Sequence, residues 1–192
     1  KIQSSDMRVS MHPGQYTVLN APDPAVLQRA IADLQYHANF LDSLGLDSSH
    51  KLILHVGGVY GNKLAALKRF SDHYKDLPDA IKRRLVIEND DRCYHIGDVL
   101  ELAGQLKIPV VYDTLHNRVN CCDPTNDDLY WISQCASTWE KPDGRQKIHY
   151  SQQDGTKKAG SHSQTIDLEE FLKFYRELGN VQPDIMLEVK DK

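Results

Sequence analysis

The sequence lacks several features that would assign it to a special class of protein. It has no apolar run near the roughly 18 residues that a transmembrane helix needs, and its start, KIQSSDMRVS, has no apolar segment typical of a signal peptide. Only four cysteines occur, none in a C-x-x-C pair, which argues against a disulfide framework and predicts a reduced, intracellular protein. The net charge of −4 argues against nucleic-acid binding by bulk positive charge alone.

What the chain does contain is the composition of a soluble globular protein. Of its 192 residues, 40% are hydrophobic and 26% are charged, which is enough for a substantial buried core. No internal repeat, low-complexity stretch or linker divides the sequence. We therefore expect residues 1–192 to form a single domain that needs no membrane and no obligate protein partner.

Six short apolar runs alternate with longer segments of mixed polarity. Three of these runs consist of three consecutive apolar residues, which is typical of strands buried on both faces of a parallel sheet. The predicted strands are Arg8–His12, Leu52–His55, Leu85–Glu88, Pro109–Asp113, Lys147–His149 and Ile185–Glu188.

Two of the intervening segments have strong helix signals. In residues 24–44 the apolar residues recur at steps of three and four, Asp23 can cap the first turn, and Gly45 can end the helix. Residues 168–178 follow the same scheme with Asp167 as the cap. Weaker helices are predicted near residues 62–76, 95–106 and 126–137.

This alternation of strands and helices predicts βα units with right-handed crossovers. Six strands and five helices fit either a doubly wound open sheet or a (β/α)8 TIM barrel. A complete barrel usually takes about 250 residues. As a barrel, the chain would lack the first two βα units and would represent the C-terminal three-quarters of the domain.

Every predicted strand ends in a side chain that can bind a metal, and two more histidines follow strands closely. The eight candidate ligands are His12, His55, Glu88, Asp113, His116, His149, His162 and Glu188. The carboxyl ends of the strands form a row in an open sheet, but they converge on one axis in a barrel. Because a metal centre requires convergence, the ligand pattern favours the barrel. By contrast, we assign Asp90 and Asp91 to turn capping.

The number and kind of these ligands indicate the metals and the reaction. Eight ligands are too many for one ion, so we expect two or three, and mixed imidazole and carboxylate ligation suits Mn²⁺ first, with Zn²⁺ or Mg²⁺ as alternatives. Two ions about 4 Å apart can generate a hydroxide and stabilise both the attacking and the leaving oxygen of a phosphodiester. The pattern therefore indicates metal-dependent phosphodiester hydrolysis.

Seven motifs extend in order from one end of the chain to the other. They are SMHPGQY (10–16), LHVGG (54–58), IENDD (87–91), YDTLHN (112–117), KIHYSQQ (147–153), GSHSQTI (160–166) and DIMLEVKDK (184–192). In combination they resemble the UV damage endonuclease (UvdE/UvsE-type) family. The resemblance implies a TIM barrel similar to endonuclease IV and the xylose isomerase-like enzymes. It also implies a DNA repair endonuclease that uses divalent metals, commonly manganese, to nick damaged double-stranded DNA 5′ of UV photoproducts and other lesions.

The resemblance further implies roles for residues beside the metals. Gln15 and Tyr16 match a pair that enters the duplex at the lesion, where aromatic stacking recovers about 1–3 kcal/mol per base. Lys147 matches a lysine that can be carboxylated, which would supply an extra anionic oxygen. Glu88, Lys147 and Glu188 are the candidate catalytic residues.

Simpler interpretations of these residues remain open from the sequence. Tyr16 could pack on the following helix while Gln15 caps the loop, and Lys147 could pair with Glu88 or Asp113. The same barrel could also carry a metal-dependent sugar isomerase or epimerase, although such a site usually needs fewer ligands, or a non-catalytic domain that metal stabilises. A DNA repair enzyme would lie in the cytoplasm, at the nucleoid, of a bacterium or in the nucleus of a eukaryote.

Overall fold

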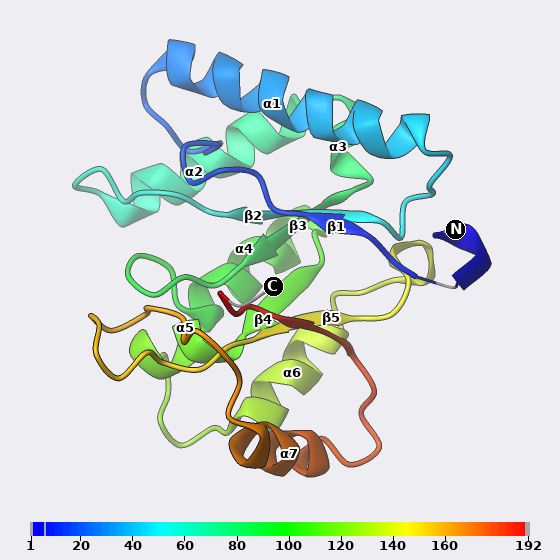
Figure 1. Ribbon diagram of the computed structural model, residues 1–192. Coiled ribbons are helices and arrows are strands. Elements are labelled where there is room, and N and C mark those ends of the chain that lie inside the picture. The colour runs from blue at the N-terminus through cyan, green and yellow to red at the C-terminus, as the bar shows by residue number, and fades with distance from the viewer. Residues whose placement is uncertain (1, 6, 191–192) are drawn as a thin grey trace.

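The computed structural model describes residues 2–5 and 7–190, and its centre is one sheet of six parallel strands (Figure 1). The strands are β1 (Ser10–Met11), β2 (Lys51–His55), β3 (Leu85–Glu88), β4 (Val110–Asp113), β5 (Lys147–Tyr150) and β6 (Asp184–Leu187). Each pairs with the next along the chain, in the order β1-β2-β3-β4-β5-β6. All six predicted strands are therefore present, although β1 is only two residues long and His12 and Glu188 lie just beyond their strands.

The helices lie outside the sheet. They are α1 (Pro24–Ser43), α2 (Lys63–Lys75), α3 (Asp79–Lys82), α4 (Ile96–Leu106), α5 (Thr114–Val119), α6 (Asp128–Ala136) and α7 (Leu168–Glu177), with 3-10 helices η1 (Gln3–Ser5) and η2 (Lys141–Asp143). The five predicted helices are confirmed, whereas the short α3 and α5 were not predicted from the sequence. Among the described residues, no helix is long and apolar enough to cross a membrane.

The predicted cap residues explain where the long helices begin and end. The Asp23 carboxylate accepts a hydrogen bond from the N–H of Ala25 at 2.8 Å, and Asp167 accepts one from the N–H of Glu170 at 2.9 Å. Gly45, with φ +69°, follows α1 in a conformation that most other residues avoid. Local sequence therefore sets these boundaries without help from the rest of the fold.

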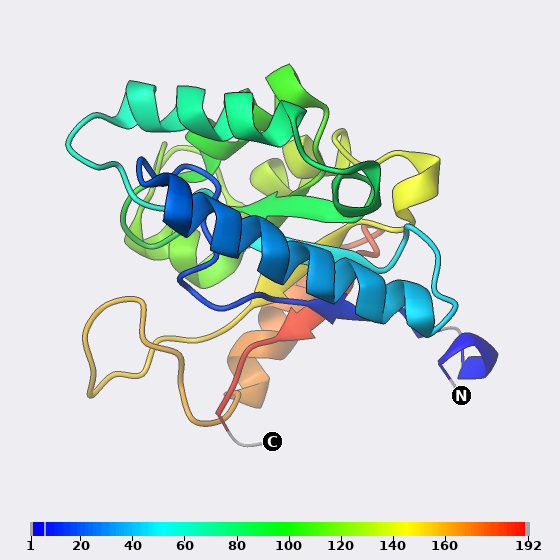
Figure 2. The same ribbon diagram turned by 90° about the horizontal axis from the view of Figure 1, so that it is seen from above.

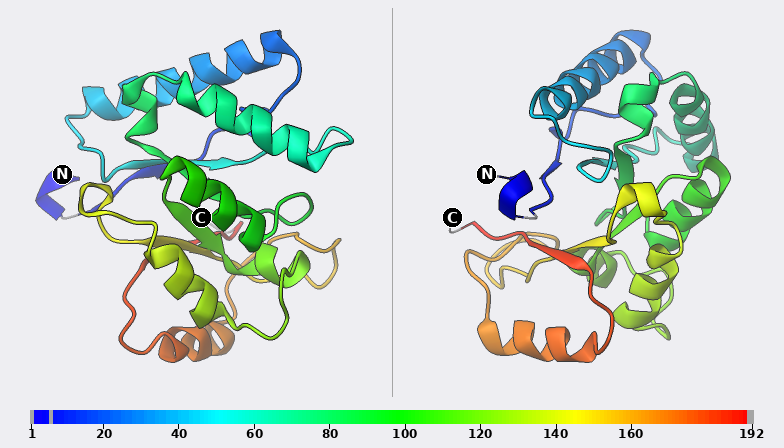
Figure 3. Two further views of the ribbon diagram at one scale, coloured as in Figure 1. Left: turned by 180° about the vertical axis from the view of Figure 1, so that it is seen from behind. Right: turned by 90° about the vertical axis from the view of Figure 1, so that its right-hand side faces the viewer.

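The sheet is curled, as the end-on view in the right panel of Figure 3 shows. The α-helices form an arc around it, and the arc is open on the side where the first and last strands lie. Across this side, Arg8 Nε lies 2.9 Å from Asp184 Oδ2, so residues next to β1 and at the start of β6 are in direct contact. The loops that follow the strands gather at the left of Figure 1, and the long segment between β5 and α7 projects there in Figure 2.

The pleat of the strands separates two apolar layers. Leu52, Leu54 and their counterparts on the other strands join the large core between the sheet and the helices. Ile53, Val86 and Val111 form a second cluster with Trp139 on the opposite face of the sheet, which is its concave face. Because side chains alternate along a strand, the residues two positions further on project to this same concave face. The pleat therefore directs the polar residues at the strand ends into the curl of the sheet.

Candidate metal centre

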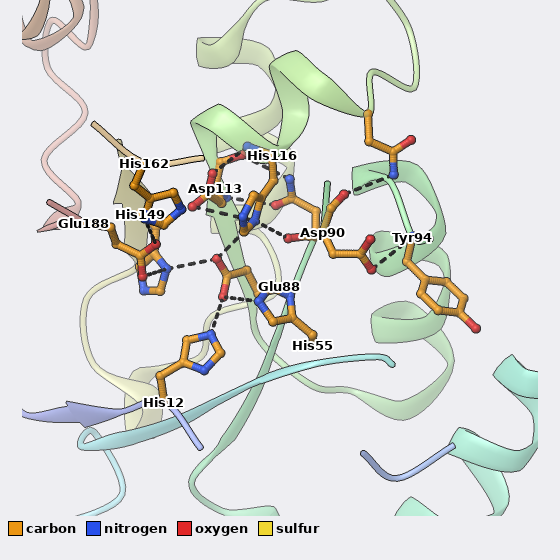
Figure 4. Close-up of polar contacts among 12 residues, drawn as sticks. His12, His55, Glu88, Asp90, Tyr94, Asp113, His116, His149, His162 and Glu188 are labelled. Carbon is orange, nitrogen blue, oxygen red and sulfur yellow. Dashed lines mark hydrogen bonds and ion pairs between the residues drawn. The ribbon is translucent and has the colours of Figure 1, made fainter. Parts of the chain in front are cut away.

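Glu88, at the end of β3, lies at the centre of the polar cluster (Figure 4). It is completely buried, and each of its carboxylate oxygens faces two imidazoles. Oε2 lies 3.1 Å from His12 Nε2 and 3.7 Å from His55 Nε2. Oε1 lies 2.9 Å from His149 Nδ1 and 3.7 Å from His116 Nδ1. One buried anion therefore connects side chains at or just beyond the carboxyl ends of four different strands.

Glu188 forms a second, more exposed carboxylate position at the edge of the cluster. Its Oε1 lies 3.2 Å from His149 Nδ1, and its Oε2 lies 3.5 Å from His162 Nδ1. The backbone around His162 is held by a β-bridge between this residue and Gln153. The ring centroids of His162 and His116 are 6.0 Å apart, so this side of the cluster is continuous with the part around Glu88.

Asp113 is the third carboxylate, and it also begins helix α5. Its Oδ1 accepts a hydrogen bond from the backbone N–H of His116 at 2.7 Å, which caps the helix and turns the His116 ring toward the cluster. Its Oδ2 is 3.7 Å from His116 Nδ1 and, among the described residues, has no hydrogen-bond partner. A short helix that the sequence did not predict thus places His116, three residues after the end of β4.

Asn89 is a supporting residue that sequence reasoning missed. Its side chain accepts a hydrogen bond from the N–H of Asp113 at 2.9 Å and donates one to the Asp113 carbonyl at 3.0 Å. The Asn89 carbonyl lies 3.0 Å from His116 Nδ1. Its place directly after Glu88, at the end of a buried strand, was the available signal. Asn89 fastens the end of β3 to the start of α5.

Three groups of side chains present ligand atoms within 4.8 Å of one another and could each hold a metal ion. They are His12, His55 and Glu88; Glu88, Asp113 and His116; and Asp113, His149 and Glu188. These groups share residues, and of the eight predicted ligands only His162 falls outside them, although it contacts Glu188.

The fit to a divalent cation rests on ligand atoms that the protein leaves unsatisfied. His55 Nδ1, Asp113 Oδ2 and His149 Nε2 are buried and have no hydrogen-bond partner among the described residues. A buried polar atom without a partner costs about 1–3 kcal/mol, so a cation at such atoms would be favourable. The donors are imidazole and carboxylate, the set that suits Mn²⁺ and Zn²⁺.

The electrostatics of the cluster also favour cation binding. Burial alone would raise the pKa of Glu88, but His149, His55 and His12 together hold it well below its usual range. Burial opposes the charge on His149 as well, yet Glu88 raises the pKa of that imidazole to about 9. Burial raises the pKa of Asp113 to about 7. Glu88 is therefore an anion at neutral pH, and the proton on His149 occupies a position that a cation could take.

Asp90 caps a turn, as the sequence predicted. Its Oδ1 accepts hydrogen bonds from the N–H groups of Arg92 and Cys93 at 2.8 and 2.5 Å, and its Oδ2 accepts one from Tyr94 N–H at 3.1 Å. Asp91 Oδ2 lies 3.4 Å from Arg92 Nε. Neither aspartate is a member of the three ligand groups.

Lys147 does not make the ion pair that the simpler interpretation required. Its Nζ donates a hydrogen bond to Ser10 Oγ at 2.7 Å, and among the described residues it forms no ion pair with Glu88 or Asp113. The reason is the pleat, because Lys147 lies two residues before His149 and hence one layer below the strand ends. Burial, reinforced by Arg8, lowers the pKa of Lys147 to about 8.

Gln15 and Tyr16 lie at the rim of a cavity of about 830 Å³ that the ligands His12, His55 and His116 also line. Tyr16 is 83% exposed, so the alternative in which it packs on the following helix is wrong. A hydrogen bond from Thr17 N–H to the carbonyl of Gly14, at 2.9 Å, closes the turn that presents both side chains. The two residues that the resemblance assigned to the lesion therefore line the same cavity as three predicted ligands.

Comparison with known proteins gives one consistent family. The sequence profile of the family described as UV-endonuclease UvdE matches residues 1–192. A UV DNA damage endonuclease of Clostridium perfringens (strain 13 / Type A) is 50% identical over 193 residues, which cover 100% of this chain and 46% of that protein. One of Bacillus cereus (strain Q1) is 37% identical over 194 residues, which cover 100% of this chain and 60% of that protein.

Solved structures extend the comparison to the fold. The crystal structure of SacUVDE matches with a TM-score of 0.91 and 40% identity over 100% of this chain and 63% of that chain. Endonuclease IV from Thermus thermophilus matches with a TM-score of 0.65 at 14% identity, over 96% of this chain and 64% of that chain. The likeness to endonuclease IV shows the fold alone, and together these structures confirm the predicted TIM-barrel type of α/β fold. The chain spans about half to two-thirds of the length of these relatives.

Proposed function

The chain belongs to the UV-endonuclease UvdE family, and from this membership and the ligand cluster we propose that it acts in a metal-dependent DNA repair endonuclease. The substrate is damaged double-stranded DNA, and the cut lies 5′ of UV photoproducts and other lesions. The observation that carries the proposal is the convergence of imidazoles and carboxylates around Glu88 in a chain 50% identical to a UV DNA damage endonuclease.

In this proposal the eight predicted residues hold two or three divalent cations, with Mn²⁺ the first choice and Zn²⁺ or Mg²⁺ as alternatives. Bound cations would lower the pKa of a water nucleophile and offset the charge of a phosphodiester. Glu88 supplies the buried central anion, whereas Glu188 is partly exposed at the edge of the cluster. Asn89 keeps Asp113 and His116 oriented through its hydrogen bonds.

Lys147 is the third proposed catalytic residue, and its role follows from the family resemblance. Its amine is buried one layer below the strand ends, with Ser10 Oγ as its hydrogen-bond partner. A carboxylated Lys147 would add an anionic oxygen to the donor set. Mass spectrometry of the intact protein tests this modification, since carboxylation adds the mass of carbon dioxide.

Gln15 and Tyr16 are proposed to enter the duplex at the lesion. Both are exposed side chains on the hydrogen-bonded turn that lines the cavity. Everting a base costs a few kcal/mol and costs least where a lesion has already disturbed stacking. An exposed ring and amide at this position could fill the gap that eversion leaves.

A plasmid-nicking assay tests the proposed function. Full-length protein with Mn²⁺ should relax UV-irradiated supercoiled plasmid and leave unirradiated plasmid intact, and mapping of the new ends should place the cut 5′ of the lesions. Glu188→Gln should lower the rate at least about 10-fold, the loss typical of groups that support a metal ligand. Glu101→Gln, on the exposed side of α4, is the matched control and should have no effect.

Two outcomes would contradict the proposal. Absence of nicking by full-length protein whose metal content is confirmed by elemental analysis would exclude the endonuclease. Turnover of a ketose by a protein that does not bind DNA would favour the sugar isomerase or epimerase.

Tyr16→Ala should weaken discrimination between damaged and undamaged DNA while leaving the metal content unchanged.

A further inference from the structure

Tyr60 is an exposed aromatic residue in the same cavity as Tyr16, and the proposed function does not use it. It lies in the loop between β2 and α2 and lines the cavity together with His55 at the metal cluster. Its neighbour Val59 packs against the core, whereas Tyr60 remains 48% exposed. The loop therefore has one side chain that anchors it and one that faces the cavity.

The backbone that carries Tyr60 is held from beneath by buried groups. Asn20 Nδ2 and the Tyr94 hydroxyl both donate hydrogen bonds to the carbonyl of Gly58, at 2.8 and 3.1 Å. Asn20 and Tyr94 are fully buried. Gly57 has φ +110°, and a Cβ at this position would lie only 2.3 Å from Asn20 Oδ1. The loop consequently fits against its support with no room for a larger residue at Gly57.

The Tyr60 side chain is also held in place. The Arg69 guanidinium lies over its ring, 5.5 Å from the centroid, and Arg69 Nε donates a hydrogen bond to the Asn20 carbonyl at 2.9 Å. A ring atom lies 3.3 Å from the position that a Cβ on Gly58 would take. Tyr60 itself has φ +47°, which costs about 1–2 kcal/mol in a residue other than glycine. The protein therefore maintains a strained backbone that presents an oriented, half-exposed ring.

We propose that Tyr60 is a second stacking platform, which binds a nucleobase of the damaged DNA against the part of its ring that Arg69 leaves free. This inference rests on the proposed function, because it requires DNA in the cavity. A ring held in advance loses little conformational entropy when a base stacks on it. Stacking accepts any base, so the platform suits an enzyme that acts at lesions in varied sequences.

Binding measurements with matched variants test this role without relying on cleavage. Fluorescence anisotropy in the presence of a chelator would compare a UV-irradiated duplex with an unirradiated duplex of the same sequence. Tyr60→Ala in the full-length protein should weaken binding of the irradiated duplex about 5- to 150-fold, the range expected for the loss of one stacked base. Binding of the unirradiated duplex should not change, since its bases stay stacked in the helix.

Two further variants and one control separate stacking from a merely structural role. Tyr60→Phe should bind like the wild type, whereas Tyr60→Leu, which is apolar but has no aromatic face, should bind like Tyr60→Ala. Tyr36→Ala, which removes a 64% exposed tyrosine on α1 that does not line the cavity, should bind like the wild type. Thermal melting of each variant reports any loss of folding.

The outcomes distinguish this inference from the proposed function. If the wild-type protein prefers the irradiated duplex and Tyr60→Ala keeps the same preference, the stacking role of Tyr60 alone is overturned. Equal binding by Tyr60→Leu and Tyr60→Phe, or equal weakening of both duplexes by Tyr60→Ala, would also overturn it. Wild-type protein that does not prefer the irradiated duplex would overturn the proposed function and the platform together.

Discussion

Glu88 shows how a single residue can organise a polar site inside an apolar sheet. Its carboxylate is buried, and burial of a lone charge is strongly unfavourable. Four imidazoles within 3.7 Å offset this cost, and His149 carries a raised pKa as a result. The same arrangement makes Glu88 central to the proposed cation binding, because it is the one anion among the described residues that all four imidazoles approach.

We predict that Glu88→Gln removes both metal binding and part of the stability of the metal-free protein. Loss of one partner from a buried ion pair leaves the other partner uncompensated, and we expect the free energy of unfolding to fall by about 3 kcal/mol. Urea denaturation in a chelator measures the stability, and elemental analysis after dialysis against Mn²⁺ measures the bound metal. Glu101→Gln should change neither quantity, and full metal occupancy in Glu88→Gln would contradict the prediction.

Helix α5 and strand β4 meet at Asp113, which serves both elements. The residue ends the strand, caps the helix through the N–H of His116 and presents its second oxygen to the cluster. Only such a direct strand-to-helix junction places Asp113 and His116 in the same group of candidate ligands. The short helix that was not predicted from the sequence is therefore part of the site.

The variant Asp113→Asn should separate the helix-capping role of this residue from its role as a metal ligand. Asparagine caps helices about as well as aspartate, so the variant should keep the stability of the metal-free protein. Its amide cannot carry the negative charge that attracts a cation, whereas the Asp113 carboxyl can lose its proton despite a pKa that burial raises to about 7. Calorimetric titration with Mn²⁺ should give an affinity at least about 10-fold weaker than that of the wild type. A variant that unfolds, or that binds Mn²⁺ normally, would be inconsistent with this division of roles.

Two glycines in different elements should respond oppositely to alanine. Gly104→Ala lies within α4, where a Cβ meets no atom within 4 Å, and it should stabilise the protein by about 0.5–1 kcal/mol. Gly57→Ala combines a positive φ with a clash against Asn20, and it should destabilise the protein by more than about 1 kcal/mol. Urea denaturation of both variants checks the pair. Equal effects would mean that the loop beneath Tyr60 can move to admit a Cβ.

At the scale of the whole molecule, the candidate ligands connect the two ends of the curled sheet. His12 follows β1 and Glu188 follows β6, and the remaining ligands come from the strands and loops between them. The sheet order runs from β1 to β6, so these two strands are the most distant in the ladder of backbone hydrogen bonds. A cation shared by this set would therefore hold together parts of the sheet that the backbone does not pair directly.

Metal should accordingly stabilise the whole fold. At a free Mn²⁺ concentration about 100 times the dissociation constant, we expect the melting temperature to rise by about 5–10 °C. Differential scanning calorimetry with Mn²⁺ and with a chelator measures this shift, and Glu88→Gln should abolish it. No shift in wild-type protein that elemental analysis shows to be loaded would contradict the prediction.

A buried arginine stabilises the fold at a position away from the candidate ligands. Its hydrogen bonds lead us to predict that the stability of the protein depends on pH in the acidic range. Arg84 is almost completely buried, and it donates hydrogen bonds to the His50 carbonyl at 3.0 Å and to Asp42 Oδ1 at 2.5 Å. The hydrogen bond from Arg84, reinforced by Arg83, lowers the pKa of Asp42. A carboxyl with a lowered pKa stabilises the folded protein above its unfolded pKa of about 3.9, and this contribution is lost as the pH falls through the folded pKa.

We therefore expect wild-type stability to fall more steeply than that of Asp42→Asn between about pH 5 and pH 3. The variant should be less stable at neutral pH, and the two proteins should converge in acid. Urea denaturation across this range in the presence of a chelator measures the difference. Parallel curves would show that Asp42 does not contribute through its charge.

The sequence by itself determined the elements and most of the candidate site. Continuous apolar runs are typical of strands covered on both faces, and β2 and β3 are buried as their runs predict. The third such run, Ile185–Leu187, does form β6, but the prediction that it is buried on both faces is wrong: Met186 and Leu187 are 39% and 42% exposed, because β6 is the last strand in the sheet order. Caps such as Asp23 and Asp167 act within one helical turn, which is why the helix boundaries were also predictable. The six polar residues at the ends of the runs were visible for the same reason, since each directly follows or ends an apolar strand.

Only the tertiary structure decided which atoms meet. The register and curl of the sheet, which arise from contacts between distant segments, bring four imidazoles to Glu88 and place Lys147 one layer lower against Ser10. The role of Asn89 depends on a neighbouring strand, and the support beneath Tyr60 depends on Asn20 and Tyr94 from two other segments. Sequence patterns report local geometry, whereas hydrogen bonds between segments far apart in the chain exist only once the chain has folded.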